Sequence, residues 1–215
     1  KGGGMMGASA LGELSGMMGA KNSVDNEVEI LRTTDLMHNM VLQEQAYIGY
    51  FKKGNVKDDP VFQAPFRLVL LSNPEDITSS FKLALKSDKG QLQLSNSDTS
   101  FNIVYNKPFT LTKVGTLELQ SNPLFIKHSD DEYGFTIAPV RKVVAGLMAS
   151  FSAEVTNKLV STIDLSLDNT VPKRGQQLLS GIIQVYIRQN LHDKNVVADS
   201  TLSFINGRLE KIKDE

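Results

Sequence analysis

The chain has 215 residues, 40% of them hydrophobic and 22% charged, which is enough to bury one substantial core. Its formal net charge of −1 provides no basic footprint for nucleic acid, and the absence of cysteine rules out disulfides, cysteine nucleophiles and thiolate metal sites. No run of about 18 uninterrupted apolar residues occurs and no signal-peptide pattern is present, so no membrane-spanning helix is expected within this sequence.

Residues 1–22 are rich in glycine, methionine, alanine and serine, a composition that holds a regular helix poorly. We therefore predict a flexible segment that becomes ordered only near neighbouring groups. Its methionines could alternatively form an adaptable surface that contacts lipid. The consecutive glycines Gly2, Gly3 and Gly4 do not indicate a phosphate-binding loop, because no Lys-Ser or Lys-Thr pair follows them at the required spacing.

A first helix is predicted over residues 24–45. Asn22, Ser23 and Asp25 supply side-chain oxygens suited to capping it, and the nearby acidic residue Glu27 adds negative charge to its first turn. Its apolar residues recur at roughly helical spacing, namely Val24, Val28, Leu31, Met37 and Val41.

Seven short β-prone runs separated by turn residues follow this helix, and several of them are expected to pair antiparallel. They cover residues 47–53, 66–71, 81–85, 91–94, 101–105, 115–119 and 135–138. The polar connection Ser87-Asp88-Lys89-Gly90 has the composition of a hairpin turn, so the third and fourth runs are predicted to form a β-hairpin.

Two further elements are expected before the last helix. Residues 139–157 are predicted to form an amphipathic helix that is entered through Pro139 and carries Val143, Val144, Leu147 and Phe151. A half-buried strand is predicted next, because apolar and polar residues alternate in it with a period of two. One set of alternating positions consists of Leu159, Ser161, Ile163, Leu165 and Leu167.

Residues 172–215 are predicted to form one long helix. Pro172 suits the first helical position, and Asn169 or Thr170 can cap the helix. At about 1.5 Å per residue the helix would extend roughly 60 Å, far more than a compact domain needs. Its second half carries a coiled-coil-like stripe, which we expect to pack against a partner helix as the first arm of a truncated helical hairpin. The stripe consists of Leu191, Ala198, Leu202, Ile205, Leu209 and Ile212.

The order of these elements predicts an α+β fold. Its base is expected to be a mixed or largely antiparallel sheet with packed helices, from which the long C-terminal helix protrudes. The expected organisation is a flexible segment at residues 1–22, a base domain at residues 23–190 and the start of the truncated hairpin at residues 191–215.

No motif in the sequence points to catalysis, to a cofactor or to a metal. The histidines His38, His128 and His192 share no ligand spacing and are interpreted as surface or boundary residues. The acidic pairs at residues 58–59 and 130–131 lie in turn-like sequence, so general acid–base chemistry is the less favoured interpretation. We therefore predict that this segment is not an enzyme.

Two segments at opposite ends of the chain resemble one known family. The run NEVEILRTTDLM resembles the first helix of the periplasmic domain of bacterial polysaccharide co-polymerases, the chain-length determinant family, and it contains Asn26, Glu27, Glu29 and Leu31. The C-terminal helix resembles the corresponding stretch of the branch linked to cytoplasmic tyrosine autokinases. The residues that carry this second resemblance are Pro172, Tyr186, Lys194, Asn195, Thr201, Phe204 and Arg208.

The resemblance implies a periplasmic domain held in the inner membrane by a transmembrane helix on either side. It implies homo-oligomeric rings, and a role in setting the length or export of capsular or extracellular polysaccharide. The implied partners are the inner membrane, an outer-membrane polysaccharide export protein and the polysaccharide. Because the nucleotide motifs of the kinase, both membrane helices and the end of the hairpin are absent from this sequence, the segment is expected to be a non-enzymatic scaffold that is monomeric or weakly associating in isolation.

Three alternatives remain open. A stand-alone chain-length determinant without a kinase would share the same features. A periplasmic adaptor of a secretion or efflux machine also joins a β-rich base to a helical hairpin, but it would carry a duplicated lipoyl-like half-motif that we do not find. A hydrolase or sugar-binding enzyme is disfavoured because the sequence has no tryptophan to stack on sugar rings.

Overall fold

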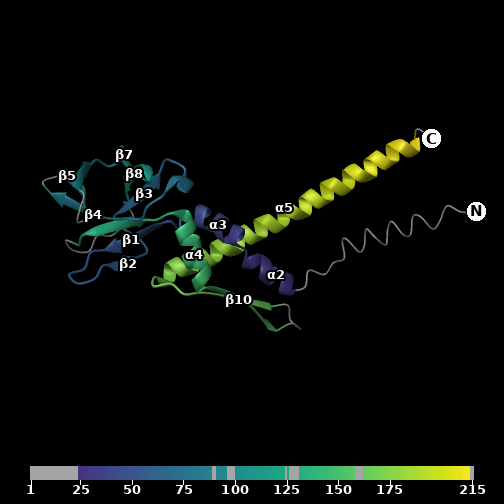
Figure 1. Cartoon of the computed structure of the whole chain (residues 1–215), viewed down its shortest axis with the longest axis horizontal. Coiled ribbons are helices and arrows are strands. Elements are labelled where there is room, and N and C mark those ends of the chain that lie inside the picture. Colours follow the sequence, from purple (N-terminus) through teal and green to yellow (C-terminus); the bar gives the residue numbers. More distant parts are fainter. Residues whose placement is uncertain are drawn as a thin grey trace, which may run out of the picture.

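The computed structural model describes residues 24–88, 91–95, 100–123, 125, 131–157 and 162–213. It confirms an α+β fold in which antiparallel sheets occupy one end of the molecule, helices lie beside them, and the long helix α5 (Pro172–Lys213) extends far beyond both (Figure 1). Residues 1–22, predicted to be flexible, lie outside the described residues.

The largest sheet has six antiparallel strands in the order β2-β1-β9-β4-β5-β6. Its strands are β1 (Ile48–Lys52), β2 (Asp59–Val61), β4 (Phe81–Asp88), β5 (Gln91–Ser95), β6 (Ser100–Ile103) and β9 (Tyr133–Ile137). The predicted hairpin is confirmed, because β4 pairs with β5, although β4 itself extends through Ser87 and Asp88. Near the middle of the sheet Gly134 is required, since a Cβ atom there would lie 2.3 Å from the Phe51 ring and 2.4 Å from the Leu83 carbonyl oxygen.

A second sheet has three antiparallel strands in the order β3-β8-β7. Its strands are β3 (Phe66–Leu70), β7 (Pro108–Leu111) and β8 (Gly115–Ser121). All seven strands predicted for the middle region are present in these two sheets. Strands β2 and β7 were not predicted; each contains a proline and lies at the edge of its sheet. Proline is tolerated at such edges because its missing N–H is not needed there, but it makes a short run resemble a loop.

The predicted helix over residues 24–45 is wrong in one respect, because the structure has two helices there, α2 (Val24–Leu31) and α3 (Thr34–Gln43). Thr33 separates them with an extended backbone, and its hydroxyl accepts from the Leu36 amide and donates to the Ile30 carbonyl. A threonine in this position ends one helix and caps the next.

The predicted helix over residues 139–157 is also wrong at its end. Helix α4 covers Val140–Ser150, where the Ser150 hydroxyl bonds back to the carbonyls of Gly146 and Leu147. Phe151 then begins β10 (Phe151–Asn157), which pairs antiparallel with β11 (Thr162–Leu167) and buries Ala153 completely. The predicted alternating strand is therefore confirmed over β11, whereas its expected start at residues 159–161 lies outside the described residues.

Helix α3 is the centre of the hydrophobic core. Its residues Leu36, Met37, Met40 and Val41 are fully buried, and it packs against both α4 and α5. An edge-to-face series of aromatic rings runs from Tyr50 through Phe66 to Phe135, with ring centroids 5.9 and 6.4 Å apart. The strands and the helices thus share one continuous core.

The long helix predicted from Pro172 is confirmed as α5, and the Asn169 side chain accepts a hydrogen bond from the Val171 amide just before it. The inner part of α5 buries Leu178, Ile182 and Val185. From Leu191 to Leu209 every residue except the half-buried Thr201 is exposed. No helix in the described part of the chain is both long and apolar enough to cross a membrane. The division of the chain at residues 22 and 190 stays a prediction.

Candidate functional site

The first candidate site is an exposed row of apolar residues along one side of α5, which we call the α5 apolar row. Its large side chains are between 43% and 58% exposed, and their spacing of three, four or seven residues keeps them on one face of the helix. The row consists of Ile183, Ile187, Leu191, Ala198, Leu202, Ile205 and Leu209. The predicted stripe contains the outer members of the row, whereas Ile183 and Ile187 precede that stripe and were not predicted. The side chain of Ile212 lies outside the described residues.

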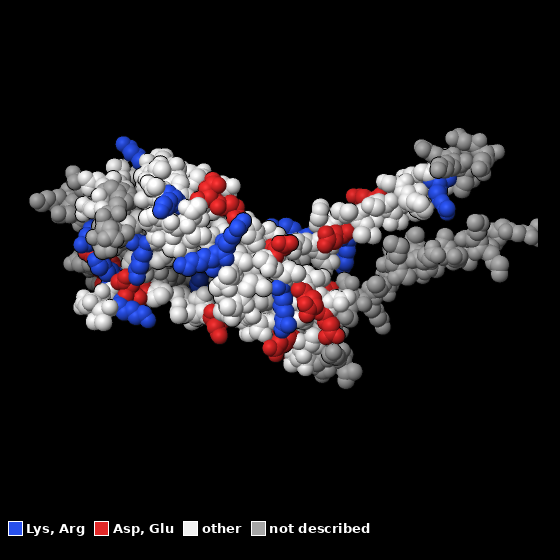
Figure 2. Space-filling model, viewed as in Figure 1, with Lys and Arg blue, Asp and Glu red and all other residues white. Residues whose placement is uncertain are grey.

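The outer part of α5 carries few charges on the face seen in Figure 2, where uncharged atoms separate isolated acidic and basic groups. Of the residues that carry the family resemblance, Lys194, Asn195, Phe204 and Arg208 are exposed there. The Arg208 guanidinium lies 5.3 Å from the centroid of the Phe204 ring, which shields part of that ring from water. The α5 apolar row itself, whose large side chains are at least 43% exposed, offers an apolar face on which an interacting helix could pack.

The structure brings together two residues of the family resemblance at the base of the projecting helix. The Tyr186 hydroxyl donates a short hydrogen bond to the Glu27 carboxylate and accepts one from the Asn190 side chain at 3.1 Å. Burial, and then the bond to Glu27, raise the pKa of Tyr186 above the ordinary value of 10.0. This contact ties α2 to α5 at the point where α5 leaves the body.

The other residues that carry the family resemblance lie apart from one another in the structure. Leu31 is buried on α2, whereas Asn26, Glu29 and Pro172 are exposed. Thr201 is half-buried on α5, where its hydroxyl bonds to the Val197 carbonyl. They therefore do not converge on one site.

Replacing Tyr186 by phenylalanine is expected to lower the free energy of unfolding by about 1 kcal/mol at pH 7, because a hydrogen bond to a charged group is lost while the ring is kept. Since the folded state holds the Tyr186 proton more tightly than the unfolded chain, this contribution is present below pH 10 and is lost as the pH rises through the raised pKa. The variant should thus show a smaller fall in stability above pH 10. Urea unfolding between pH 7 and 11 measures both effects.

Tyr105→Phe is the matched control at pH 7, because burial alone raises the pKa of Tyr105. Its stability at pH 7 should stay within about 0.5 kcal/mol of the parent. Equal losses for the two variants at pH 7 would contradict a role for the Glu27 contact.

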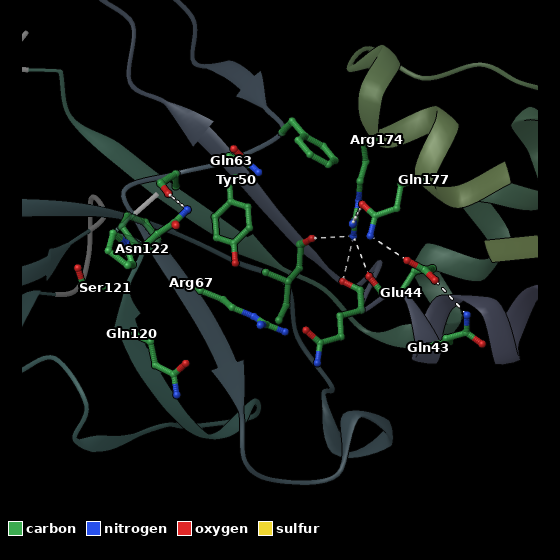
Figure 3. Close-up of a pocket in the computed structure, with 16 residues that line it drawn as sticks. Gln43, Glu44, Tyr50, Gln63, Arg67, Gln120, Ser121, Asn122, Arg174 and Gln177 are labelled. Carbon is green, nitrogen blue, oxygen red and sulfur yellow. Dashed lines mark hydrogen bonds between the residues drawn. The ribbon is translucent and has the colours of Figure 1, made fainter. Parts of the chain in front are cut away.

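The second candidate site is a cleft of about 570 Å³ between the two larger sheets and the first turns of α5 (Figure 3). We call it the amide-lined cleft, because side-chain amides form much of its wall. These are Gln43, Gln45, Gln63, Gln120, Asn122 and Gln177. The Tyr50 hydroxyl faces the cleft and accepts a hydrogen bond from the Leu68 amide of β3 at 3.0 Å.

Arg174 joins three elements at one end of this cleft. Its Nη2 atom donates to the carbonyls of Glu44 and Gln45 at 3.2 Å and of Ile48 at 3.5 Å, and its Nη1 atom donates to the Gln177 side chain at 2.7 Å. Burial lowers the pKa of Arg174, and the charge of Glu44 opposes this shift. The arginine thus fixes the turn between α3 and β1, in which Gln45 has a positive φ of 48°.

The histidines and acidic pairs noted in the sequence lie in ion pairs or at the surface, where the structure describes them. His38 Nε2 lies 2.6 Å from the Glu75 carboxylate, and His192 is exposed. Asp58 lies 2.6 Å from Lys82, whose hydrogen bond lowers the pKa of that carboxyl, while Asp131 pairs with Lys52 at 2.8 Å. His128 and Asp130 lie outside the described residues. Among the residues that are described, no group of three histidine or acidic side chains is placed to hold a metal.

The fold and the two sites define an α+β module with a projecting helix that has an exposed apolar face. The chain is 23% identical, over 97% of its length, to the tyrosine-protein kinase ptk of Acinetobacter johnsonii. It spans 31% of the length of that protein. No family model matches the chain. The similarity is distant, and it fits the resemblance to the kinase-linked co-polymerases loosely.

The amide-lined cleft was not anticipated from the sequence. Its wall comes from α3, β1, β3, β8 and α5, so its residues share no local pattern. Gly181 allows a close approach of α5 to the end of α3, because a Cβ atom there would lie 2.7 Å from the Glu44 side chain, but it does not line the cleft.

Proposed function

We propose that this chain is the periplasmic domain of an inner-membrane polysaccharide co-polymerase linked to a tyrosine kinase. In this role it is a non-enzymatic scaffold that oligomerises and helps to control the length or export of capsular or extracellular polysaccharide. The observation that carries the proposal is the similarity to a protein named as a tyrosine kinase along nearly the whole chain. The contact between Glu27 and Tyr186 supports it, because it joins the two segments in which the family resemblance lies.

The shape of the molecule suits a scaffold. A body with one continuous core holds the base of α5 through Leu178, Ile182 and Val185, and the apolar row continues outward from that base. Burying such a row against a returning helix or a second subunit would release about 25 cal/mol for each Å² of apolar surface removed from water. The chemistry offered by the row is therefore association.

A topology experiment on the full-length protein tests the proposal. Alkaline phosphatase fused after Lys213 should be active and a green fluorescent protein at the same position should be dark, because the first requires export and the second fails to mature after it. The reverse pattern would place the domain in the cytoplasm and reject the proposed function.

A second measurement separates the kinase-linked form from a stand-alone chain-length determinant. For both forms, deleting the gene should change the length distribution of a surface polysaccharide on a gel or remove the polysaccharide altogether. Only the kinase-linked form should also lose phosphotyrosine from the membrane fraction. An unchanged polysaccharide would count against both forms.

A further inference from the structure

The amide-lined cleft offers hydrogen bonding of a particular kind. A side-chain amide both donates and accepts, so a wall of amides matches ligands whose hydroxyl groups do the same. Several of these amides are already engaged within the protein, since Asn122 donates to the Ala64 carbonyl and Gln120 to Glu118. Gln63 is exposed at the rim. The volume of about 570 Å³ lies within the range of small-molecule sites, about 300–1,000 Å³.

The charge of the cleft favours an anion. Its lining carries the guanidinium groups of Arg67 and Arg174 and the carboxylate of Glu44. Arg174 is committed to three carbonyls, and Glu44 accepts from Gln43 and Gln177. Arg67 is exposed and forms no salt bridge within the part of the chain that the structure describes. Figure 3 shows its side chain reaching from β3 towards the middle of the cleft, below the Tyr50 ring.

The edge of β3 disfavours an extended peptide as the occupant. Among the strands that the structure describes, this strand pairs only with β8, so its other edge would be open to an added strand. At the centre of that edge the Leu68 amide already donates to the Tyr50 hydroxyl. An added strand would have to displace this hydroxyl, whereas a ligand recognised through its own hydroxyl groups can use it.

We infer that the amide-lined cleft binds a short anionic saccharide, with one sugar carboxylate paired to Arg67 and sugar hydroxyls bonded to Tyr50 and the amides around it. A guanidinium and a carboxylate can form two parallel hydrogen bonds, which fix the orientation of the ligand as well as strengthening its binding. The choice of a saccharide over other hydroxyl-bearing anions rests on the proposed function, whereas the preference for a ligand with hydroxyl groups and a carboxylate rests on the cleft alone.

Calorimetry with the whole chain and three defined probes tests this inference. Trigalacturonate should bind saturably, and maltotriose, which lacks the carboxylates, should bind at least about tenfold more weakly. Triglutamate carries similar charge on a peptide and should also bind at least about tenfold more weakly. Trigalacturonate should shift the backbone amide resonances of Tyr50, Gln63 and Arg67.

Two matched substitutions locate the site. Arg67→Gln should weaken trigalacturonate binding by about tenfold, because it keeps a polar side chain but removes the charge. Arg141→Gln, a change of the same kind at an exposed position on α4, should leave binding within about twofold. Both replace exposed side chains, so both variants should fold.

Three results would overturn the inference: no saturable binding of trigalacturonate up to about 10 mM, equal binding of triglutamate, or equal effects of the two substitutions. Failure here is distinguishable from failure of the proposed function. A periplasmic domain whose cleft binds no saccharide would keep the scaffold role and lose this site. A cytoplasmic domain that binds trigalacturonate through Arg67 would keep the site and lose the scaffold role.

Discussion

Arg174→Met is expected to lower the free energy of unfolding by about 3 kcal/mol, because it leaves three backbone carbonyls without their charged donor. Those carbonyls belong to Glu44, Gln45 and Ile48, and they lie 126 to 130 residues away in sequence. Methionine keeps much of the side-chain volume, so the loss should reflect the hydrogen bonds more than the packing. Urea unfolding at pH 7, followed by circular dichroism, measures it.

Arg188→Met is the matched control for this prediction, since Arg188 lies on the same helix and is exposed. Its effect should stay within about 0.5 kcal/mol. Arg174→Lys should give an intermediate loss, because a lysine keeps the charge but cannot reach three carbonyls with one planar group. If Arg174→Met cost no more than Arg188→Met, the turn between α3 and β1 would not depend on this arginine.

The parts of the fold that were predicted correctly have strong local signals. The alternation around Ile163 and Leu165 indicates a strand whatever lies beside it, and it is observed as β11. The hairpin of β4 and β5 follows from a polar turn between two apolar runs. Pro172 fixes the start of α5 because proline fits the first helical turn and little else in a helix.

The errors arose where a local pattern fits two structures. Thr33 is acceptable inside a helix, and only its capping bond to the Leu36 amide shows that it separates two helices. Phe151 continues the apolar spacing of α4, but pairing with β11 makes it the first residue of a strand. At Phe151 pairing with a separate strand overrides helix propensity, whereas at Thr33 a local capping bond ends one helix and begins the next.

The two candidate sites differ in the same way. The outer α5 apolar row could be predicted because it lies on one helix, so its period is visible in the sequence. The amide-lined cleft could not, because Tyr50, Arg67 and Arg174 become neighbours only when β1, β3 and α5 pack together. A site built from such distant segments leaves no regular residue spacing in the sequence by which it could be predicted.

Replacing Leu202 and Leu209 together by aspartate in the full-length protein is expected to abolish its assembly. These two side chains are 58% and 51% exposed in the isolated chain, so the substitutions should change its stability by no more than about 0.5 kcal/mol. In an assembly that buries the α5 apolar row, each buried aspartate would cost several kcal/mol unless it found a partner. Under the proposed function, chemical crosslinking in membranes should show loss of the oligomer bands, and the length control of the polysaccharide should fail with them.

The matched control places the same two charges on the opposite face of the same helix. Val196 and Ser203 are also seven residues apart and exposed, and the helical period puts both away from the row. Val196→Asp with Ser203→Asp should therefore keep the oligomer bands and the polysaccharide pattern. Loss of assembly in both double variants would mean that charge anywhere on α5 is harmful, whereas loss in neither would mean that the row is not buried in the assembly. Only the asymmetric result supports a partner packed on Leu202 and Leu209.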